Sequence, residues 1–131
     1  MRVEQLAALP EYGAFADYSS TSTVVGWSSY TAKQIRYKRV GTIVFVSFHI
    51  VGTSNAATAT FTIPHLAASG MSTQGALVYT AVDNGVVLTV PPRAYVNTGS
   101  GTININKDMA GGAWTASGSK QVDGCIWYEA T

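Results

Sequence analysis

The sequence TIVFVSFHIV at residues 42–51 decides the fold of this 131-residue chain. Its apolar residues recur at every second position, which is the period of a β-strand and not of a helix. One face of the predicted strand is wholly apolar and carries Val44, Val46, Phe48 and Ile50. The other face is apolar only where the strand starts. We therefore predict a central strand whose second face is partly covered by another sheet or another subunit.

Further strands are predicted on the C-terminal side of this segment. They cover residues 57–63, 75–82, 86–90, 95–97, 102–106 and 122–129. In the first of them three threonines alternate with apolar residues, so we expect their hydroxyls to face water. Asn84-Gly85 supplies the positive φ angles of a tight hairpin turn. Seven to nine short strands at regular spacing predict an all-β domain, an antiparallel β-sandwich or jelly roll.

The first 23 residues are predicted to form a stem or linker before a sandwich domain that spans residues 24–131. Val3, Leu6 and Leu9 place apolar groups on one side of a short helix over residues 3–9, and Pro10 stops it. A helix of this length is marginal alone, so it must dock on its own domain or on copies of itself. Residues 11–23, with their run of serine and threonine, are expected to be irregular.

The scarcity of charge narrows the range of partners. Charged residues make up 11% of the chain and leave a formal net charge of +1, which argues against nucleic acid. No apolar run approaches the roughly 18 residues of a membrane span, so no membrane insertion is expected. Cys125 stands alone, so neither an internal disulfide nor a cysteine zinc site is expected. The first residues lack the apolar core of a signal peptide, which predicts synthesis in the cytoplasm without signal-directed secretion.

Several segments together resemble a known family. They are GWSSY at 26–30, IRYKRVG at 35–41 with the strand that follows, ATFTIP at 59–64 and the ending GCIWYE at 124–129. Because of these four segments, residues 24–131 resemble the C-terminal tip or receptor-binding domains of tail-fibre and tailspike proteins of tailed bacteriophages and prophages. The resemblance implies a β-sandwich at the distal end of a virion fibre, made in the bacterial host and assembled as a parallel homotrimer.

The same resemblance implies a non-enzymatic domain that binds a host receptor, such as surface polysaccharide or lipopolysaccharide. Two alternatives stay open. One is a purely structural cap that holds the trimer together and binds no ligand. The other is a carbohydrate-binding module attached to a depolymerase that lies upstream. The family has no universal catalytic motif, so the resemblance assigns no residue a chemical role and implies no cofactor.

Aromatic and amide side chains suggest where a sugar would bind. Trp114 follows Gly111-Gly112, so we expect it on an exposed loop, where a large aromatic has little structural reason to be. The other candidates of this polar surface are Tyr95, Asn97, Asn104 and Asn106. Aromatic faces pack on pyranose C–H groups while amides bond the hydroxyls. Trp27 and Trp127 lie within strand patterns and are expected in the core or at a subunit interface.

Four of the eight cationic residues crowd into one predicted strand: Lys33, Arg36, Lys38 and Arg39. Arg36 and Lys38 share a face, which suggests either a groove for acidic polysaccharide or a charged strand that resists sheet-to-sheet aggregation. Arg39 points the other way and is a candidate for reaching an acid across a subunit boundary. The candidate interface residues are Ile43, Phe45, Trp127 and Arg39, joined by Cys125 in the cap alternative.

Enzymatic signatures are weak. His49 and His65 have no carboxylate at metal-ligand spacing, and no pair of acids is placed for glycoside hydrolysis. Cys125 has no basic helper nearby and is expected to be buried and inert. We therefore expect no catalytic residue, no metal site within the chain and no cofactor.

Overall fold

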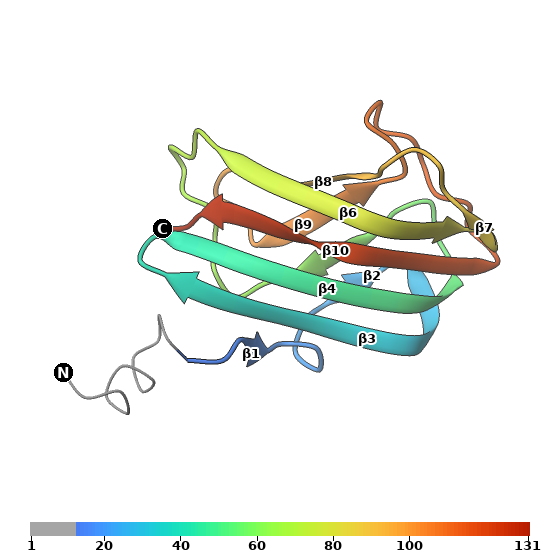
Figure 1. The fold of residues 1–131 in the computed structure, drawn as a ribbon, viewed down its shortest axis with the longest axis horizontal. Coiled ribbons are helices and arrows are strands. Elements are labelled where there is room, and N and C mark those ends of the chain that lie inside the picture. Colours follow the sequence, from blue (N-terminus) through green and yellow to red (C-terminus); the bar gives the residue numbers. More distant parts are fainter. Residues whose placement is uncertain (1–12) are drawn as a thin grey trace.

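The computed structural model describes residues 13–131 as two antiparallel β-sheets with ten strands and no helix (Figure 1). The large sheet has the order β1-β3-β4-β10-β6-β7, and the small sheet has the order β2-β5-β9-β8. The strands are β1 (Ala16–Asp17), β2 (Val24–Val25), β3 (Trp27–Val40), β4 (Ile43–Ser54), β5 (Thr60–Thr62), β6 (Gln74–Asp83), β7 (Val86–Val87), β8 (Arg93–Val96), β9 (Thr102–Asn106) and β10 (Ser119–Glu129). The predicted all-β sandwich is confirmed. Across residues 13–131, no helix is long and apolar enough to span a membrane.

The strand predicted at 42–51 lies inside the large sheet. It becomes β4, which pairs with β3 on one side and with β10 on the other, and β10 pairs with β6 in turn. Figure 1 shows these four long strands side by side in one layer, with the small sheet behind them. Strands β3 and β4 form a hairpin whose turn places Gly41 at φ +59°. Glycine tolerates this left-handed conformation without steric cost.

Core side chains alternate along the strands as the sequence predicts. The inward hydrophobic residues of β4 and β10 that are at most 3% exposed are Val44, Val46, Phe48, Ile50, Val122, Ile126 and Tyr128. Phe61 of the small sheet meets this layer, with its ring centroid 5.2 Å from that of Phe48. Each fully buried apolar side chain contributes about 1.5–3 kcal/mol, so this shared layer holds the two sheets together.

The hairpin predicted at Asn84-Gly85 is confirmed. Asn84 has φ 50° and Gly85 has φ 79°, the two positive angles of a type I′ turn. The strand after the turn is shorter than predicted, because β7 covers only Val86–Val87 of residues 86–90. Two prolines follow at 91 and 92, and proline cannot donate to a strand ladder.

The N-terminal part differs from the prediction. The helix predicted at 3–9 lies outside the described residues. Residues 13–23 have no regular structure apart from β1, as expected, but they are bound to the sandwich: β1 pairs with β3, and the Tyr18 amide donates to the Ile35 carbonyl at 2.8 Å. The Ser22 hydroxyl donates to the Thr62 carbonyl at 2.8 Å. The Ser19 hydroxyl accepts a hydrogen bond from the Ile35 amide. Serines of the predicted linker therefore bond the backbone of both sheets.

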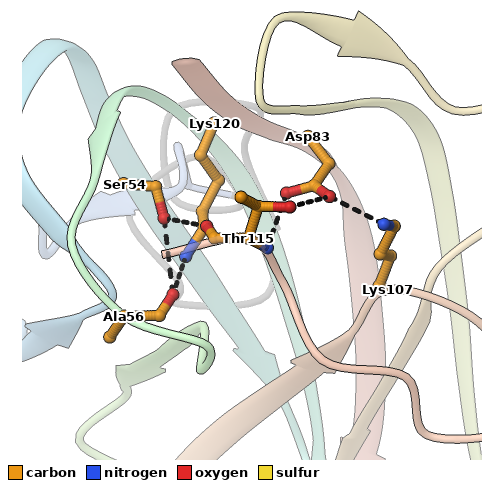
Figure 2. A network of polar contacts seen from close by, with 6 residues as sticks. All are labelled: Ser54, Ala56, Asp83, Lys107, Thr115 and Lys120. Atoms are coloured by element: carbon orange, nitrogen blue, oxygen red, sulfur yellow. Dashed lines mark hydrogen bonds and ion pairs between the residues drawn. The ribbon is translucent and has the colours of Figure 1, made fainter. Parts of the chain in front are cut away.

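A buried lysine joins the two sheets at one end of the sandwich (Figure 2). Lys120 of β10 is fully buried, and its ammonium donates to the carbonyls of Gly26, Ala56 and Thr58, each at 3.0 Å. The ring of Trp27 lies 4.9 Å from the same nitrogen, a cation–π distance. Three acceptors and an aromatic face replace the water that this charge loses on folding.

A second set of bonds fixes the loop between β9 and β10. Asp83 accepts from the amide and the hydroxyl of Thr115 at 2.9 Å each and from the Lys107 ammonium at 2.7 Å (Figure 2). Burial by itself would raise the pKa of Asp83, but the bonds from Lys107 and Thr115 together outweigh it and lower the pKa. The Ser54 hydroxyl donates to the Thr115 carbonyl at 2.6 Å. The loop is therefore held at both ends against the large sheet.

The free energy of unfolding is expected to rise between about pH 8 and 10 through Lys120. Burial lowers the pKa of Lys120 from 10.5 to about 8, although the charge of Asp83 raises it in part. The unfolded chain binds more protons than the folded chain in this window, and stability then grows with pH. Above about pH 10 Tyr128 acts in the opposite direction, because burial raises its pKa to about 12.

Urea denaturation at about pH 7.5, 8.5 and 9.5 measures this dependence. The slope should be smaller in Lys120→Met, which has no group to titrate there. An equal slope in the variant and the original protein would contradict the assignment to Lys120.

Candidate functional site

Polar side chains line the outer face of the small sheet. Val96 and Ile103 point into the core, so their strand neighbours Tyr95 and Asn104 point outward. Tyr95 pairs with Asn104, and Asn104 pairs with Thr60. Three consecutive strands therefore place an aromatic ring, an amide and a hydroxyl in one row. The outward threonines predicted in residues 57–63 are part of this face.

A cleft of about 330 Å³ opens over this row. Its sheet side is formed by Thr58, Thr60, Tyr95, Asn104 and Asn106, and its other wall is formed by residues 111–113. Ligand pockets commonly measure about 300–1,000 Å³, so the volume of this cleft lies at the lower end of that range.

The loop wall of the cleft has a fixed shape. The Asp108 carboxylate accepts from the amides of Ala110 and Gly112 at 3.0 and 2.9 Å. A Cβ on Gly112 would meet that carboxylate at 2.5 Å, and Gly111 has φ +85°. The backbone conformation at Gly111 therefore favours glycine, and Gly112 leaves room for the bonded Asp108 carboxylate. The glycine pair serves the close packing of this loop and gives the cleft a pre-formed edge.

The cleft offers the chemistry that a neutral sugar needs. Tyr95 is half-buried and the Arg93 guanidinium lies 4.4 Å from its ring centroid. Arg93 lines the hollow beside the cleft and not the cleft itself, so the ring separates the two. The Asn104 side-chain amide donates to the Thr102 carbonyl at 3.3 Å, which orients the amide. One aromatic surface and two side-chain amides therefore line the cleft together.

Trp114 does not belong to this site, and the expectation that it is exposed is wrong. Its side chain is 3% exposed, and its indole N–H donates to the Ile105 carbonyl at 2.8 Å. Its ring also lies 5.6 Å from the Lys120 ammonium. The bonds of Asp83 to Thr115 pull the loop inward and seat the indole in the core.

The other candidate ligand residues lie elsewhere. Asn97 lines a separate hollow with Gln74. The Gln74 side-chain amide donates to the Val96 carbonyl, and its oxygen accepts from the Val96 amide. Arg36 and Lys38 lie on the outer face of the large sheet, and the Lys38 ammonium donates to the Gly13 carbonyl. The structure therefore brings Tyr95, Asn104 and Asn106 together. Asn97, Arg36 and Lys38 lie away from that group.

The candidate interface residues of the large sheet do form one patch. Phe45 and Trp127 are cross-strand partners that are 42% and 37% exposed. Ile43 lies on the same face of β4, two residues before Phe45. A Cβ on Gly75 would meet the Trp127 indole nitrogen at 2.3 Å, so the indole lies directly against Gly75 of β6. Leu77 of β6 extends the patch.

Two further expectations concern Arg39 and Cys125. The Arg39 guanidinium donates to the carbonyls of Thr131 and Gly41 at 2.7 and 2.9 Å, so it has partners within its own chain. Cys125 is exposed and not buried, because it alternates with the inward Gly124 and Ile126 on β10. Trp27, expected in the core or at an interface, is in the core.

Sequence reasoning missed a histidine–carboxylate pair. His49 and Asp123 are cross-strand neighbours on β4 and β10, and the imidazole Nδ1 bonds the carboxylate. The two residues are 74 positions apart, so only the strand register brings them together. Within residues 13–131, no group of three or more His, Cys, Asp or Glu side chains is placed to hold a metal ion.

Comparisons with protein-family models, with curated proteins and with solved structures gave no match to this chain. The fold and the cleft alone define its class, an antiparallel β-sandwich with a polar, aromatic-sided cleft on its small sheet.

Proposed function

We propose that this chain is a non-enzymatic carbohydrate-binding domain at the tip of a phage tail fibre or tailspike. It acts as a homotrimer in the virion and binds polysaccharide or lipopolysaccharide on the host surface. The observation that carries this proposal is the cleft in which Tyr95, Asn104 and Asn106 converge from two strands. The fibre part of the proposal rests on the segments at 26–30, 35–41, 59–64 and 124–129.

A small cleft of this kind gives weak binding at each site. A dissociation constant of about 1 mM corresponds to about −4 kcal/mol. Linking several copies raises the apparent affinity by roughly 10²–10⁴ without any new contact, provided that the copies engage one surface together. Trimeric assembly therefore supplies the strength that the single cleft lacks.

A purely structural trimer cap is the second candidate. The observation that favours it is the exposed apolar patch of Phe45, Trp127 and Leu77 on the large sheet. Exposed apolar patches mark protein interfaces when they are contiguous. A cap binds no sugar, so a binding experiment separates the two candidates. A module tethered to a depolymerase has the same cleft and differs only in its neighbouring domain.

Replacing Tyr95 with alanine is expected to weaken sugar binding at least tenfold and to leave the melting temperature nearly unchanged. The ring is partly exposed, lies beside the Arg93 guanidinium and is not part of the hydrophobic core, so its loss removes a ligand surface and little core. A glycan array with bacterial surface polysaccharides identifies the ligand, and titration calorimetry of the variant measures the loss.

Tyr30→Ala is the matched control, because Tyr30 is also a partly exposed tyrosine stacked with a cation, Lys33, but lies on β3. It should bind as the original protein does. Array signals equal for Tyr95→Ala and Tyr30→Ala would place the site elsewhere, and no signal for any glycan would favour the cap.

A further inference from the structure

A second hollow, of about 200 Å³, lies on the outer face of the large sheet. It is separate from the cleft of the small sheet. Its polar lining comes from Gln34 and Arg36 of β3, Ser47 and His49 of β4, and Tyr79 of β6. Side chains from three strands thus converge over the backbone of Gly124 in β10.

A β-bulge places Tyr79 at this hollow. Asp123 pairs with Thr80 and Gly124 pairs with Val78, so Tyr79 is the extra residue and is 68% exposed. A Cβ on Gly124 would meet the Leu77 carbonyl at 2.3 Å, so the bulge requires glycine there. Bulges re-aim single side chains and are over-represented next to active and binding sites. The aromatic ring is turned outward by a specific backbone device.

The imidazole of His49 is held in a defined orientation. Its Nδ1 bonds the Asp123 carboxylate, whose other oxygen accepts from the Gln121 side-chain amide at 2.6 Å. Asp123 is only 6% exposed although it lies on the outer face of the sheet. Because a carboxylate occupies Nδ1, the second ring nitrogen, Nε2, is left for a ligand.

Arg36 brings a positive charge to the hollow. Across residues 13–131 its guanidinium forms no hydrogen bond or ion pair, and the Asp123 carboxylate is already bonded to His49 and Gln121. Asp17, the cross-strand partner of Arg36, is close enough to interact with its charge. The Asp17 carboxylate nevertheless accepts its hydrogen bonds from the Ser19 amide and hydroxyl, so the guanidinium donors of Arg36 remain available. A planar guanidinium suits a carboxylate, which it binds through two parallel hydrogen bonds.

We propose that this hollow binds the carboxylate-bearing ring of an acidic sugar, such as a uronic acid. Arg36 takes the carboxylate, His49 Nε2 and Ser47 bond the ring hydroxyls, and Tyr79 packs on the C–H face of the ring. A hollow below the size of a drug pocket of about 300 Å³ holds a single such residue. This second site extends the proposed function, and it stands or fails separately because it lies on the other sheet from Tyr95.

Titration of the ¹⁵N-labelled protein with sodium glucuronate, followed by amide chemical shifts, tests the proposal. The shifts should concentrate at Arg36, Ser47, His49 and Tyr79, and glucose, which lacks the carboxylate, should leave them unchanged. Arg36→Gln should weaken glucuronate binding about 10- to 100-fold, since a charge-assisted hydrogen-bond pair is lost. His49→Gln should weaken it as well while the thermal unfolding curve stays that of a folded protein.

Arg93→Gln is the matched control, because it removes an arginine that is also exposed but lies on the other sheet, and it should bind glucuronate normally. Inorganic phosphate that shifts the same amides as strongly as glucuronate would show a general anion site and overturn the sugar assignment. Absent or scattered shifts, or an Arg36→Gln variant that binds as well as Arg93→Gln, would overturn the site itself. Loss of sugar binding in Tyr95→Ala but not in Arg36→Gln would leave only the first cleft.

Discussion

Lys120→Met is expected to lower the free energy of unfolding by about 3–5 kcal/mol. Methionine keeps the length of the side chain but has no donor for the carbonyls of Gly26, Ala56 and Thr58. Each carbonyl left unpaired in the interior costs about 1–3 kcal/mol, reduced where water enters. Urea denaturation at about pH 7 measures the difference.

Lys33→Met is the control for this experiment. Lys33 lies over the Tyr30 ring at 5.2 Å and carries no set of buried carbonyls. Its replacement should change stability by no more than about 0.5 kcal/mol, as is usual for surface positions. A loss below about 1 kcal/mol for Lys120→Met would mean that the carbonyls find other partners and that the lysine does not join the sheets.

Trp114→Ala should destabilise the protein by a similar amount, about 3–5 kcal/mol. The substitution empties a buried volume, leaves the Ile105 carbonyl without its donor and removes one of the two rings near Lys120. The loop wall of the cleft would then lose its anchor, so sugar binding should fall only together with stability. Thermal and urea unfolding measure the loss.

Trp127→Ala separates burial from residue type. Trp127 is 37% exposed and lies on the outer face, so its loss should cost clearly less than the loss of Trp114. If Trp114→Ala kept its full stability and lost only sugar binding, Trp114 would be a ligand residue on an exposed loop, as its sequence context predicts.

The fold is largely predictable because its signals are local. Alternation over residues 42–51 identifies a strand between neighbours, and Asn84-Gly85 fixes a hairpin without reference to the rest of the chain. The N-terminal serines are the exception, since their bonds to Ile35 and Thr62 depend on strands that lie far along the sequence. Local composition describes such residues as linker, and only the tertiary structure gives them partners.

The candidate site is predictable only in part, because strand order is not written in local patterns. Period two places Tyr95, Asn104 and Asn106 on outward positions, but their meeting depends on the pairing of β8 with β9. Trp114 is misplaced because the bonds that bury its loop come from Asp83, 32 positions away from Thr115. The His49–Asp123 pair is invisible for the same reason.

The position of β10 has a consequence for how the chain acquires its structure. This strand lies between β4 and β6. Every residue of β10 that pairs with β4 has a partner more than 60 positions earlier in the sequence, from Ser119 with Thr53 to Glu129 with Ile43. During synthesis the edges of β4 and β6 that pair with β10 have no strand partner until residues 119–129 have left the ribosome. Folds dominated by such distant pairings form slowly, over milliseconds to seconds, and expose unpaired strand edges meanwhile. The large sheet is therefore completed from its middle, by the segment that is made last among its strands.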